Sequence, residues 1–138
     1  MNSLVVDFLE HAITLSDNNY FNVFVEYAQP KTRILDLINR SGKDVAKPSF
    51  ISDKLNLSRV AVTVSLNQME KEGLIERKLS AQDRRNIIVN ITKLGLNEVK
   101  NIREKAYFFL TDMFNTIGKK RTEDLFEIIT ILFKEKIK

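Results

Sequence analysis

The sequence contains no cysteine and only one histidine among its 138 residues. Without thiols there are no disulfides, thiolate metal sites, cysteine nucleophiles or thiol-based redox sensors. A Ser-His-Asp triad or a His-rich metal site would have to be built around His11, in the amphipathic stretch DFLEHAIT. We interpret His11 as an ordinary packed or surface residue. We therefore expect no enzyme, no metal site and no cofactor, since the remaining carboxylates are scattered along helices.

Glycine is also scarce, and the four glycines lie too far apart to form a phosphate-binding loop of the GxGxxG or P-loop type. No apolar run approaches the roughly 20 residues that a membrane-spanning helix needs. The start of the chain, MNSLVVDFLEHAITL, lacks the basic region and the small-residue cleavage site of a secretory signal. We expect a cytoplasmic protein without a membrane partner, and 43% apolar residues are enough to build a core.

Positive charge is concentrated in the middle of the chain. Residues 41–95 contain ten Lys and Arg against six Asp and Glu, an excess equal to the net charge of +4 of the whole chain. Eight of the nine phenylalanines lie outside this segment. The basic centre and the aromatic flanks therefore predict two different roles.

The sequence from Lys31 to Gly73 predicts three helices, of which the last two form a helix–turn–helix pair. KTRILDLINRS before Gly42 has apolar residues at helical spacing, and PSFISDKL begins with Pro48, which suits a first helical turn. Ser58 is placed to cap the next helix, SRVAVTVSLNQMEKE, which ends at Gly73. Its β-branched residues favour a strand. The stripe of Val62, Leu66 and Met69 nevertheless predicts a helix packed on Ile51 and Leu55.

A hairpin follows this pair of helices. LIERKL and NIIVNIT each alternate in the manner of a strand, with SAQDRR at the tip. Helical patterns return from Thr92 to Phe114 and again from Arg121, where we expect Thr122 to cap the last helix. The predicted fold is mainly α with a small β-hairpin wing, a winged helix-turn-helix flanked by dimerisation helices. The expected regions are residues 1–30, 31–95 and 96–138.

Helix, helix and basic hairpin in this order form a DNA-reading unit. The second helix can enter the major groove, where arginine pairs with guanine, hydroxyls meet base edges or phosphates, and valine meets a thymine methyl. Arginines at the hairpin tip would lie over the neighbouring minor groove. The candidate DNA-binding residues are Ser58, Arg59, Val60, Thr63, Val64 and Asn67 on the helix, Lys78, Asp83, Arg84 and Arg85 in the hairpin, and Lys54 for the DNA backbone.

Three fragments of this segment together resemble the MarR family of multiple antibiotic resistance regulators. They are MEKEGLIER, DRR at residues 83–85, and ITKLG. The resemblance runs from about Ile34 to Gly95, and the flanking helices match only in length and apolarity. Two positions depart from the family pattern: Val64 stands where arginine is frequent, and Ala46 and Lys47 offer no Ser or Thr cap before Pro48.

The resemblance implies a homodimeric regulator that binds double-stranded DNA at a palindromic operator, often a repressor released by a small anionic or phenolic ligand. It also implies that the first helix and the last two form the dimer interface. Ser58 to Glu72 would be the recognition helix, Arg85 or Arg84 would enter the minor groove, and Asp83 would orient that arginine.

Two questions stay open at this point. The flanking aromatic residues can line a ligand pocket or form core and dimer interface, and we favour the interface. These residues are Phe8, Phe21, Phe24, Phe108, Phe109, Phe114, Phe126 and Phe133. The alternative function is a winged-helix interaction module, an anti-regulator that pairs with another subunit and does not read DNA. The localised positive charge and the DRR tip favour DNA.

Overall fold

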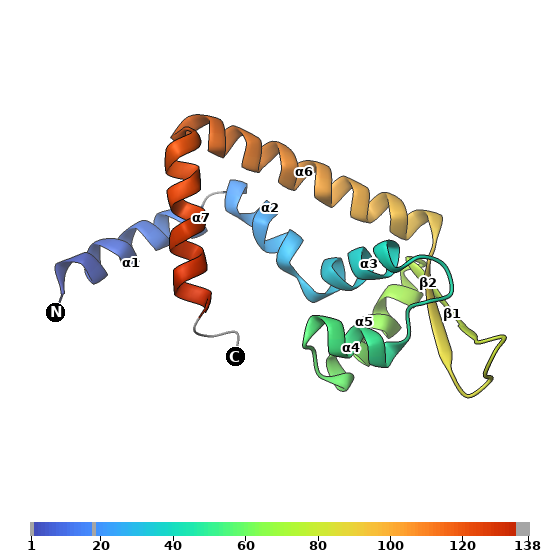
Figure 1. Ribbon diagram of the computed structural model, residues 1–138. Coiled ribbons are helices and arrows are strands. Elements are labelled where there is room, and N and C mark those ends of the chain that lie inside the picture. Colours follow the sequence, from blue (N-terminus) through green and yellow to red (C-terminus); the bar gives the residue numbers. More distant parts are fainter. Residues whose placement is uncertain (1, 18, 135–138) are drawn as a thin grey trace.

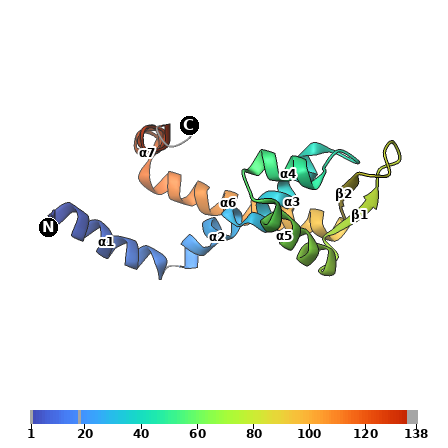
Figure 2. The same ribbon diagram turned by 90° about the horizontal axis from the view of Figure 1, so that it is seen from below.

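The computed structural model describes residues 2–17 and 19–134, which form seven helices and one hairpin. Helices α3, α4 and α5 and the hairpin gather at one end of the molecule, and the long helix α6 leads from there to α7 (Figure 1). Helix α1 extends from the opposite end (Figure 2). The elements are α1 (Ser3–Ser16), α2 (Asn19–Ala28), α3 (Pro30–Ser41), α4 (Pro48–Leu55), α5 (Arg59–Lys71), β1 (Ile75–Leu79), β2 (Ile87–Ile91), α6 (Lys93–Ile117) and α7 (Lys119–Lys134).

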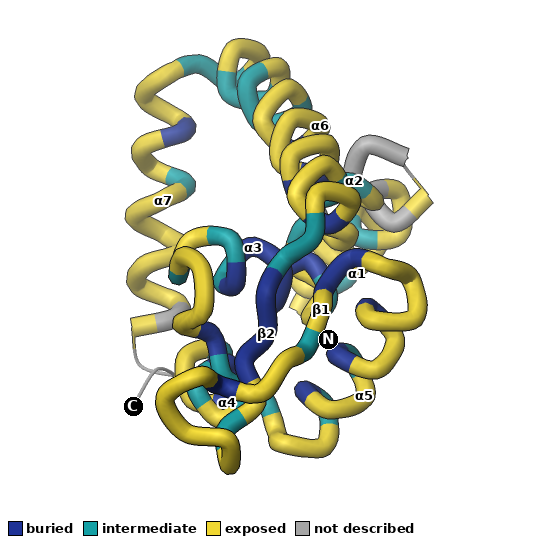
Figure 3. Tube along the Cα trace, turned by 90° about the vertical axis from the view of Figure 1, so that its right-hand side faces the viewer, coloured by how far each residue is buried: buried dark blue, intermediate teal, exposed yellow. Residues whose placement is uncertain are grey.

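The hydrophobic core lies where α3, α4, α5 and the hairpin meet, and the predicted fold class is confirmed. Burial concentrates in α3 and β2, whereas α7 is mostly exposed (Figure 3). Fully buried side chains come from every element of this unit, and they include Ile34, Leu35, Ile38, Ile51, Val62, Leu66, Met69 and Val89. Burying aliphatic side chains of this size stabilises a fold by about 1.5 to 3 kcal/mol each.

Helix α5 forms despite its β-branched residues, as predicted. The Ser58 side chain accepts a hydrogen bond from the backbone N–H of Ala61 at 3.1 Å, which satisfies a free donor of the first turn. The stripe of Val62, Leu66 and Met69 is buried. Gly73 follows the helix with φ of 73°, a left-handed conformation that costs glycine little. Burial of one face and two good ends therefore outweigh local propensity.

Helix α4 begins at Pro48 without a side-chain cap, since Lys47 occupies the cap position. The helix ends at Asn56, which is left-handed with φ of 51°. The Ser52 hydroxyl donates to the Leu57 carbonyl at 2.7 Å and holds the short turn that leads to Ser58. These contacts fix α4 and α5 as a helix-turn-helix.

The two strands pair antiparallel from Ile75 opposite Ile91 to Leu79 opposite Ile87. The predicted simple alternation of β2 is wrong, because Ile88, Val89 and Asn90 are all buried. The cause is a second neighbour: the Val89 N–H donates to the Ala46 carbonyl at 2.8 Å, so the α3–α4 segment covers the other edge of β2. Helices α3, α4 and α6 also contact β2, so neither face of the strand is open to solvent over these residues.

The start of the last helix differs from the prediction. Gly118, with φ of 83°, ends α6, and α7 begins at Lys119. Thr122 is therefore not the cap. It lies inside the first turn, where its hydroxyl donates to the Gly118 carbonyl at 2.9 Å. A threonine that bonds the carbonyl four residues back satisfies its hydroxyl within the helix.

The flanking aromatic residues have mixed roles. Phe114 and Phe126 pack edge to face, with ring centroids 5.5 Å apart, and join α6 to α7. Phe8 and Phe108 are about 70% exposed, at 72% and 69%. The side chains of Phe21, Phe24 and Phe133 lie outside the described residues. Over residues 2–17 and 19–134, no helix combines the length and the apolarity required to cross a membrane.

Candidate nucleic-acid interface

The solvent-facing side of α5 carries the residues expected from the sequence. Arg59, Val60, Thr63, Val64 and Asn67 are all exposed, with Val60 at 73% and Val64 at 60%. The Thr63 hydroxyl donates to the Arg59 carbonyl at 2.9 Å, so its oxygen remains available only as an acceptor. Two exposed valines beside a threonine methyl form an apolar strip that contributes nothing to the core.

The N-terminal end of α5 is electropositive. Its first turn contains no acidic residue, and Arg59 is its first residue. The positive end of the helix dipole adds to this charge. Lys54 of α4 is also exposed, and its ammonium lies 5.9 Å from the centroid of the Phe50 ring. Anions are favoured at such a helix end, because both the dipole and free N–H groups attract them.

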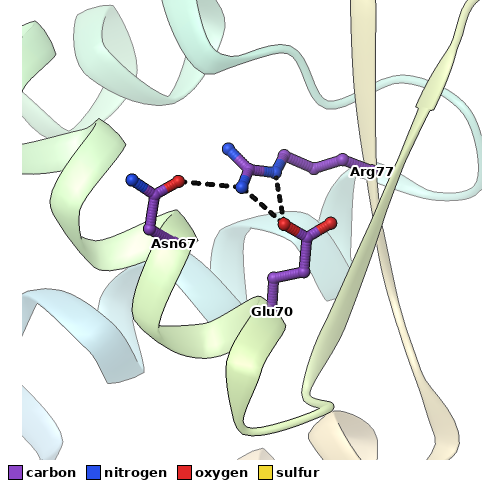
Figure 4. A network of polar contacts seen from close by, with 3 residues as sticks. All are labelled: Asn67, Glu70 and Arg77. Carbon is purple, nitrogen blue, oxygen red and sulfur yellow. Dashed lines mark hydrogen bonds and ion pairs between the residues drawn. The ribbon is translucent and has the colours of Figure 1, made fainter.

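Asn67, Glu70 and Arg77 form a polar network between α5 and β1 (Figure 4). The Arg77 Nη2 donates to Asn67 Oδ1 at 2.8 Å, and Nε donates to Glu70 Oε2 at 3.0 Å. Arg77 also holds the pKa of the Glu70 carboxyl below its usual value by hydrogen bonding. The sequence did not identify Arg77 as a site residue, although the alternation of LIERKL already placed it on the same strand face as Ile75.

A second network anchors the hairpin to the α3–α4 segment. Lys78 Nζ lies 2.7 Å from Asp44 Oδ1, and the Asn90 side chain donates to the same oxygen at 2.8 Å. The Asp44 N–H donates to Asn90 Oδ1 at 2.9 Å. Lys78 first, and Asn90 second, hold the pKa of Asp44 below its usual value. Lys78, a candidate DNA contact, is thus engaged within the protein, and sequence reasoning missed Asp44 and Asn90.

The hairpin tip, residues 80–86, is shaped by side-chain caps instead of glycine or proline. Asp83 Oδ1 accepts from the backbone N–H of Arg85, and Oδ2 accepts from the Asn86 side chain, both at 3.0 Å. Ser80 N–H donates to the Asn86 carbonyl at 2.9 Å and closes the loop. Asp83 therefore holds the backbone of Arg85, whereas the resemblance implied that it orients the arginine side chain.

The exposed side chains of Arg84 and Arg85 make no ion pair with any residue that the structure describes, and the same holds for Arg59 and Lys54. All four cations belong to α4, α5 and the hairpin, which lie at the same end of the molecule (Figure 1). Arg77 and Lys78 are instead neutralised by Glu70 and Asp44. The unpaired charges thus lie on the α5 side and at the hairpin tip.

An open pocket of about 880 Å³ lies between α6 and the helices α2 and α3. Its lining combines aromatic and basic side chains, among them Tyr27, Lys100, Arg103, Tyr107 and Phe108. Arg103 Nη1 also lies 3.4 Å from Asp36 Oδ1 of α3. Within the described ranges, no three His, Cys, Asp or Glu side chains gather as metal ligands.

The helix-turn-helix followed by the anchored hairpin defines a winged helix-turn-helix protein. The sequence model of the MarR family matches residues 29–86. A relative in Bacillus subtilis, the uncharacterised HTH-type transcriptional regulator YfiV, is 26% identical over 108 residues, which are 78% of this chain and 66% of YfiV. The chain thus spans just under two thirds of that relative's length. Residues 29–86 of the chain are thus similar to the MarR family.

Solved structures agree with the fold. The Staphylococcus aureus MepR–DNA complex superposes with a TM-score of 0.68 at 16% identity, covering 98% of both chains. The YusO protein of Bacillus subtilis gives a TM-score of 0.70 at 14% identity, covering 96% of this chain and 93% of YusO. At these identities the likeness shows the fold. The named Bacillus subtilis relative is an HTH-type transcriptional regulator.

Proposed function

We propose that the protein is a sequence-specific regulator of transcription that binds double-stranded DNA. The observation that carries the proposal is the exposed face of α5, where Arg59, Thr63 and Asn67 project beside two exposed valines. These side chains match the donors, acceptors and methyl groups of the major groove. The related MepR has been solved in complex with DNA, and its fold resembles this one.

In this proposal α5 enters the major groove and the hairpin lies over the adjacent minor groove. Ser58, Arg59, Val60, Thr63, Val64 and Asn67 face the bases, and Lys54 meets the DNA backbone. Arg84 contacts phosphate and Arg85 enters the minor groove, where narrow A·T-rich segments attract arginine. Asp83 supports Arg85 through its backbone N–H. The Lys78–Asp44 ion pair ties the hairpin to the α3–α4 segment, so that the hairpin and α5 can contact DNA together.

The proposed regulator is a homodimer on a palindromic operator. Apolar side chains of α1, α6 and α7 are exposed well beyond what a monomer usually shows, and they include Leu4, Phe8, Ile13, Tyr107, Phe108, Ile128 and Ile131. A two-fold dimer through these helices would bury them and present two copies of α5 about one DNA turn apart. Residues 1–30 and 96–138 then serve dimerisation, and residues 31–95 serve DNA binding.

Light scattering at micromolar concentration should therefore detect a dimer, and Phe8→Glu should weaken it at least tenfold. The reason is that a carboxylate placed in an apolar interface loses hydration without gaining a partner. Val60→Glu is the matched control, since Val60 is equally exposed but lies on α5. A stable monomer of the unchanged protein, or equal effects of the two variants, would contradict this interface.

We further propose that the protein is a repressor released by a small ligand. The pocket between α2, α3 and α6 offers two tyrosines and the cations of Lys100 and Arg103, which suit an aromatic anion. A ligand that pairs with Arg103 would compete with Asp36 and so affect the contact between α6 and α3. Through this contact, ligand binding at α6 would affect α3 and the DNA-reading unit.

A salt titration of DNA binding tests the proposed function at the hairpin tip. Each phosphate neutralised by a cation adds about 0.9 to the slope of log affinity against log salt, so Arg84→Ala should flatten the slope of a dimer by roughly 1.8. Arg85→Ala should in addition remove any preference for A·T-rich flanks over G·C-rich flanks, because the arginine reads groove width. Asp83→Ala should resemble a milder Arg85→Ala, since the loop backbone is released.

Lys119→Ala, at the far end on α7, is the matched loss of one exposed lysine and should leave the slope unchanged. The titration is run on operator and random duplexes that carry each type of flank. If the two arginine variants keep the slope of the unchanged protein, the hairpin tip has no place in the DNA interface and the proposed docking is wrong.

A further inference from the structure

Asn67 lies on the exposed face of α5, but its amide is already half occupied. Its Oδ1 accepts a hydrogen bond from Arg77 Nη2 at 2.8 Å. A guanidinium has five donors and no acceptor, so only the amide oxygen can face it. The Asn67 Nδ2 therefore points away from Arg77, toward the open side of the helix (Figure 4).

Arg77 is itself held in place, which makes the orientation of Asn67 persistent. It projects from β1, whose pairing with β2 fixes its backbone. Its Nε and Nη2 both donate to Glu70 Oε2, and Glu70 lies one turn after Asn67 on the same helix. The Arg77 side chain is 26% exposed, which is the lowest value among the four basic side chains of residues 31–95 that form ion pairs there. Strand and helix thus clamp one guanidinium between two side chains.

The orientation has a consequence for base recognition. A free asparagine amide reads adenine with both ends, because its oxygen accepts from N6 while its nitrogen donates to N7. Because Oδ1 is turned toward Arg77, the Nδ2 donors are what Asn67 presents outward. Guanine offers these donors two acceptors, O6 and N7, whereas adenine offers N7 beside an amino group that needs an acceptor. The Arg77 N–H donor beside Oδ1 also opposes the amino donors of adenine and cytosine, whereas O6 of guanine and O4 of thymine are acceptors.

We propose that Arg77 makes Asn67 a donor-only reader, so that α5 selects guanine or thymine and rejects adenine at the base that Asn67 meets. Arg77 is in this sense a positioning residue for specificity, acting through Asn67. This inference rests on the proposed function, since it concerns how the same face reads DNA. It adds a residue from the hairpin to the reading of the major groove.

Selection of binding sites from a randomised duplex library with the full chain tests this proposal. Asn67→Ala should remove the preference at one position of each half-site, and the unchanged protein should favour guanine or thymine there by roughly tenfold over adenine. In the double variant Arg77→Met/Glu70→Ala the amide is free to turn and the net charge is kept. Adenine should then become equal to or better than guanine at that position.

Asn67→Asp gives a second test that does not disturb the core. The carboxylate keeps an acceptor for Arg77 and presents a second acceptor outward in place of the donor. Because an acidic side chain accepts from cytosine N4, the preference should move to cytosine. Lys119→Met on α7 controls for loss of a surface cation and should select the same sites as the unchanged protein. Thermal melting verifies that each variant is folded.

The outcomes separate this inference from the proposed function. If the unchanged protein selects no sequence, both are overturned. If it selects a clear palindrome in which Asn67→Ala flattens no position, or in which that position is adenine, only the donor-only role of Asn67 is overturned. An unchanged preference in both Arg77→Met/Glu70→Ala and Asn67→Asp likewise overturns the inference while the proposed function stands.

Discussion

Gly95→Ala is expected to destabilise the protein by about 3 kcal/mol or more, the upper range for overpacking a core. For a chain of this size that loss lowers the melting temperature by roughly 10 °C. Gly95 is buried in the first turn of α6, where a Cβ atom would overlap the Leu74 carbonyl oxygen. It would also lie 2.9 Å from Cγ1 of Ile91, so the methyl group has nowhere to move.

The overlap cannot be relieved cheaply, because the backbone around Leu74 is fixed by several hydrogen bonds. The Leu74 N–H donates to the Met69 carbonyl at 2.9 Å, and the Leu74 carbonyl accepts from the Thr92 N–H at 3.0 Å. The Thr92 hydroxyl accepts from the Gly95 N–H at 3.1 Å and donates to the Gly73 carbonyl. Shifting α6 would therefore disturb the end of α5 and the base of the hairpin at once.

Gly42→Ala is the control for this prediction. Gly42 has φ of 84°, which strains an alanine, but nothing lies within 4 Å of an added Cβ. Its cost should be about 1 to 2 kcal/mol, the cost of backbone strain alone. Thermal melting of both variants distinguishes the two causes. A Gly95→Ala protein that melts within about 2 °C of the unchanged chain would show that α6 does not dock on Leu74 as described.

The elements of the DNA-reading unit could be predicted because their signals are local. Ser58 and Gly73 mark the ends of α5, and the periodicity of Val62, Leu66 and Met69 identifies its buried face. These signals depend on backbone geometry and on spacing along one helix. They therefore hold whatever the helix packs against. The exposed face of α5 follows directly, as what remains once the buried stripe is assigned.

The failures at β2 and at Arg77 have a common cause, because each depends on a neighbour outside the element concerned, whereas the failure at Thr122 is local. The pattern of β2 gave no sign that Ala46 and Asp44 cover its second edge, which buries Asn90. Arg77 and Asn67 are ten residues apart, and only the return of the chain into β1 brings them together. Helix α7 starts directly after Gly118 without a linker. Threonine is a suitable N-cap residue, but Thr122 lies one turn beyond the N-cap position of α7.

Arg59 is placed where it does not favour the stability of the free protein. A cation in the first turn of a helix opposes the helix dipole, at a cost of about 0.3 to 1 kcal/mol. Arg59 is the first residue of α5, it is exposed, and no acidic residue of that turn compensates it. Arg59→Ala should therefore leave the melting temperature unchanged or slightly raised. A residue whose removal does not harm the fold is free to serve binding.

The same substitution should produce the largest loss of DNA affinity among single changes on α5. Residues at the N-terminal end of a recognition helix contact base edges, and a lost bidentate arginine–guanine contact costs about 1 to 3 kcal/mol, or about 2 to 6 kcal/mol for the two contacts of a dimer. The affinity for random DNA should fall much less, because random DNA lacks the base contact.

Affinities for a selected operator and for a random duplex, measured at one salt concentration, give the ratio of specific to non-specific binding directly. Lys71→Ala is the matched control, since Lys71 is an exposed cation in the last turn of the same helix. If Arg59→Ala, like Lys71→Ala, weakened binding to operator and to random DNA by the same factor, Arg59 would contribute charge only. Base recognition would then have to come from Thr63, Val64 and Asn67.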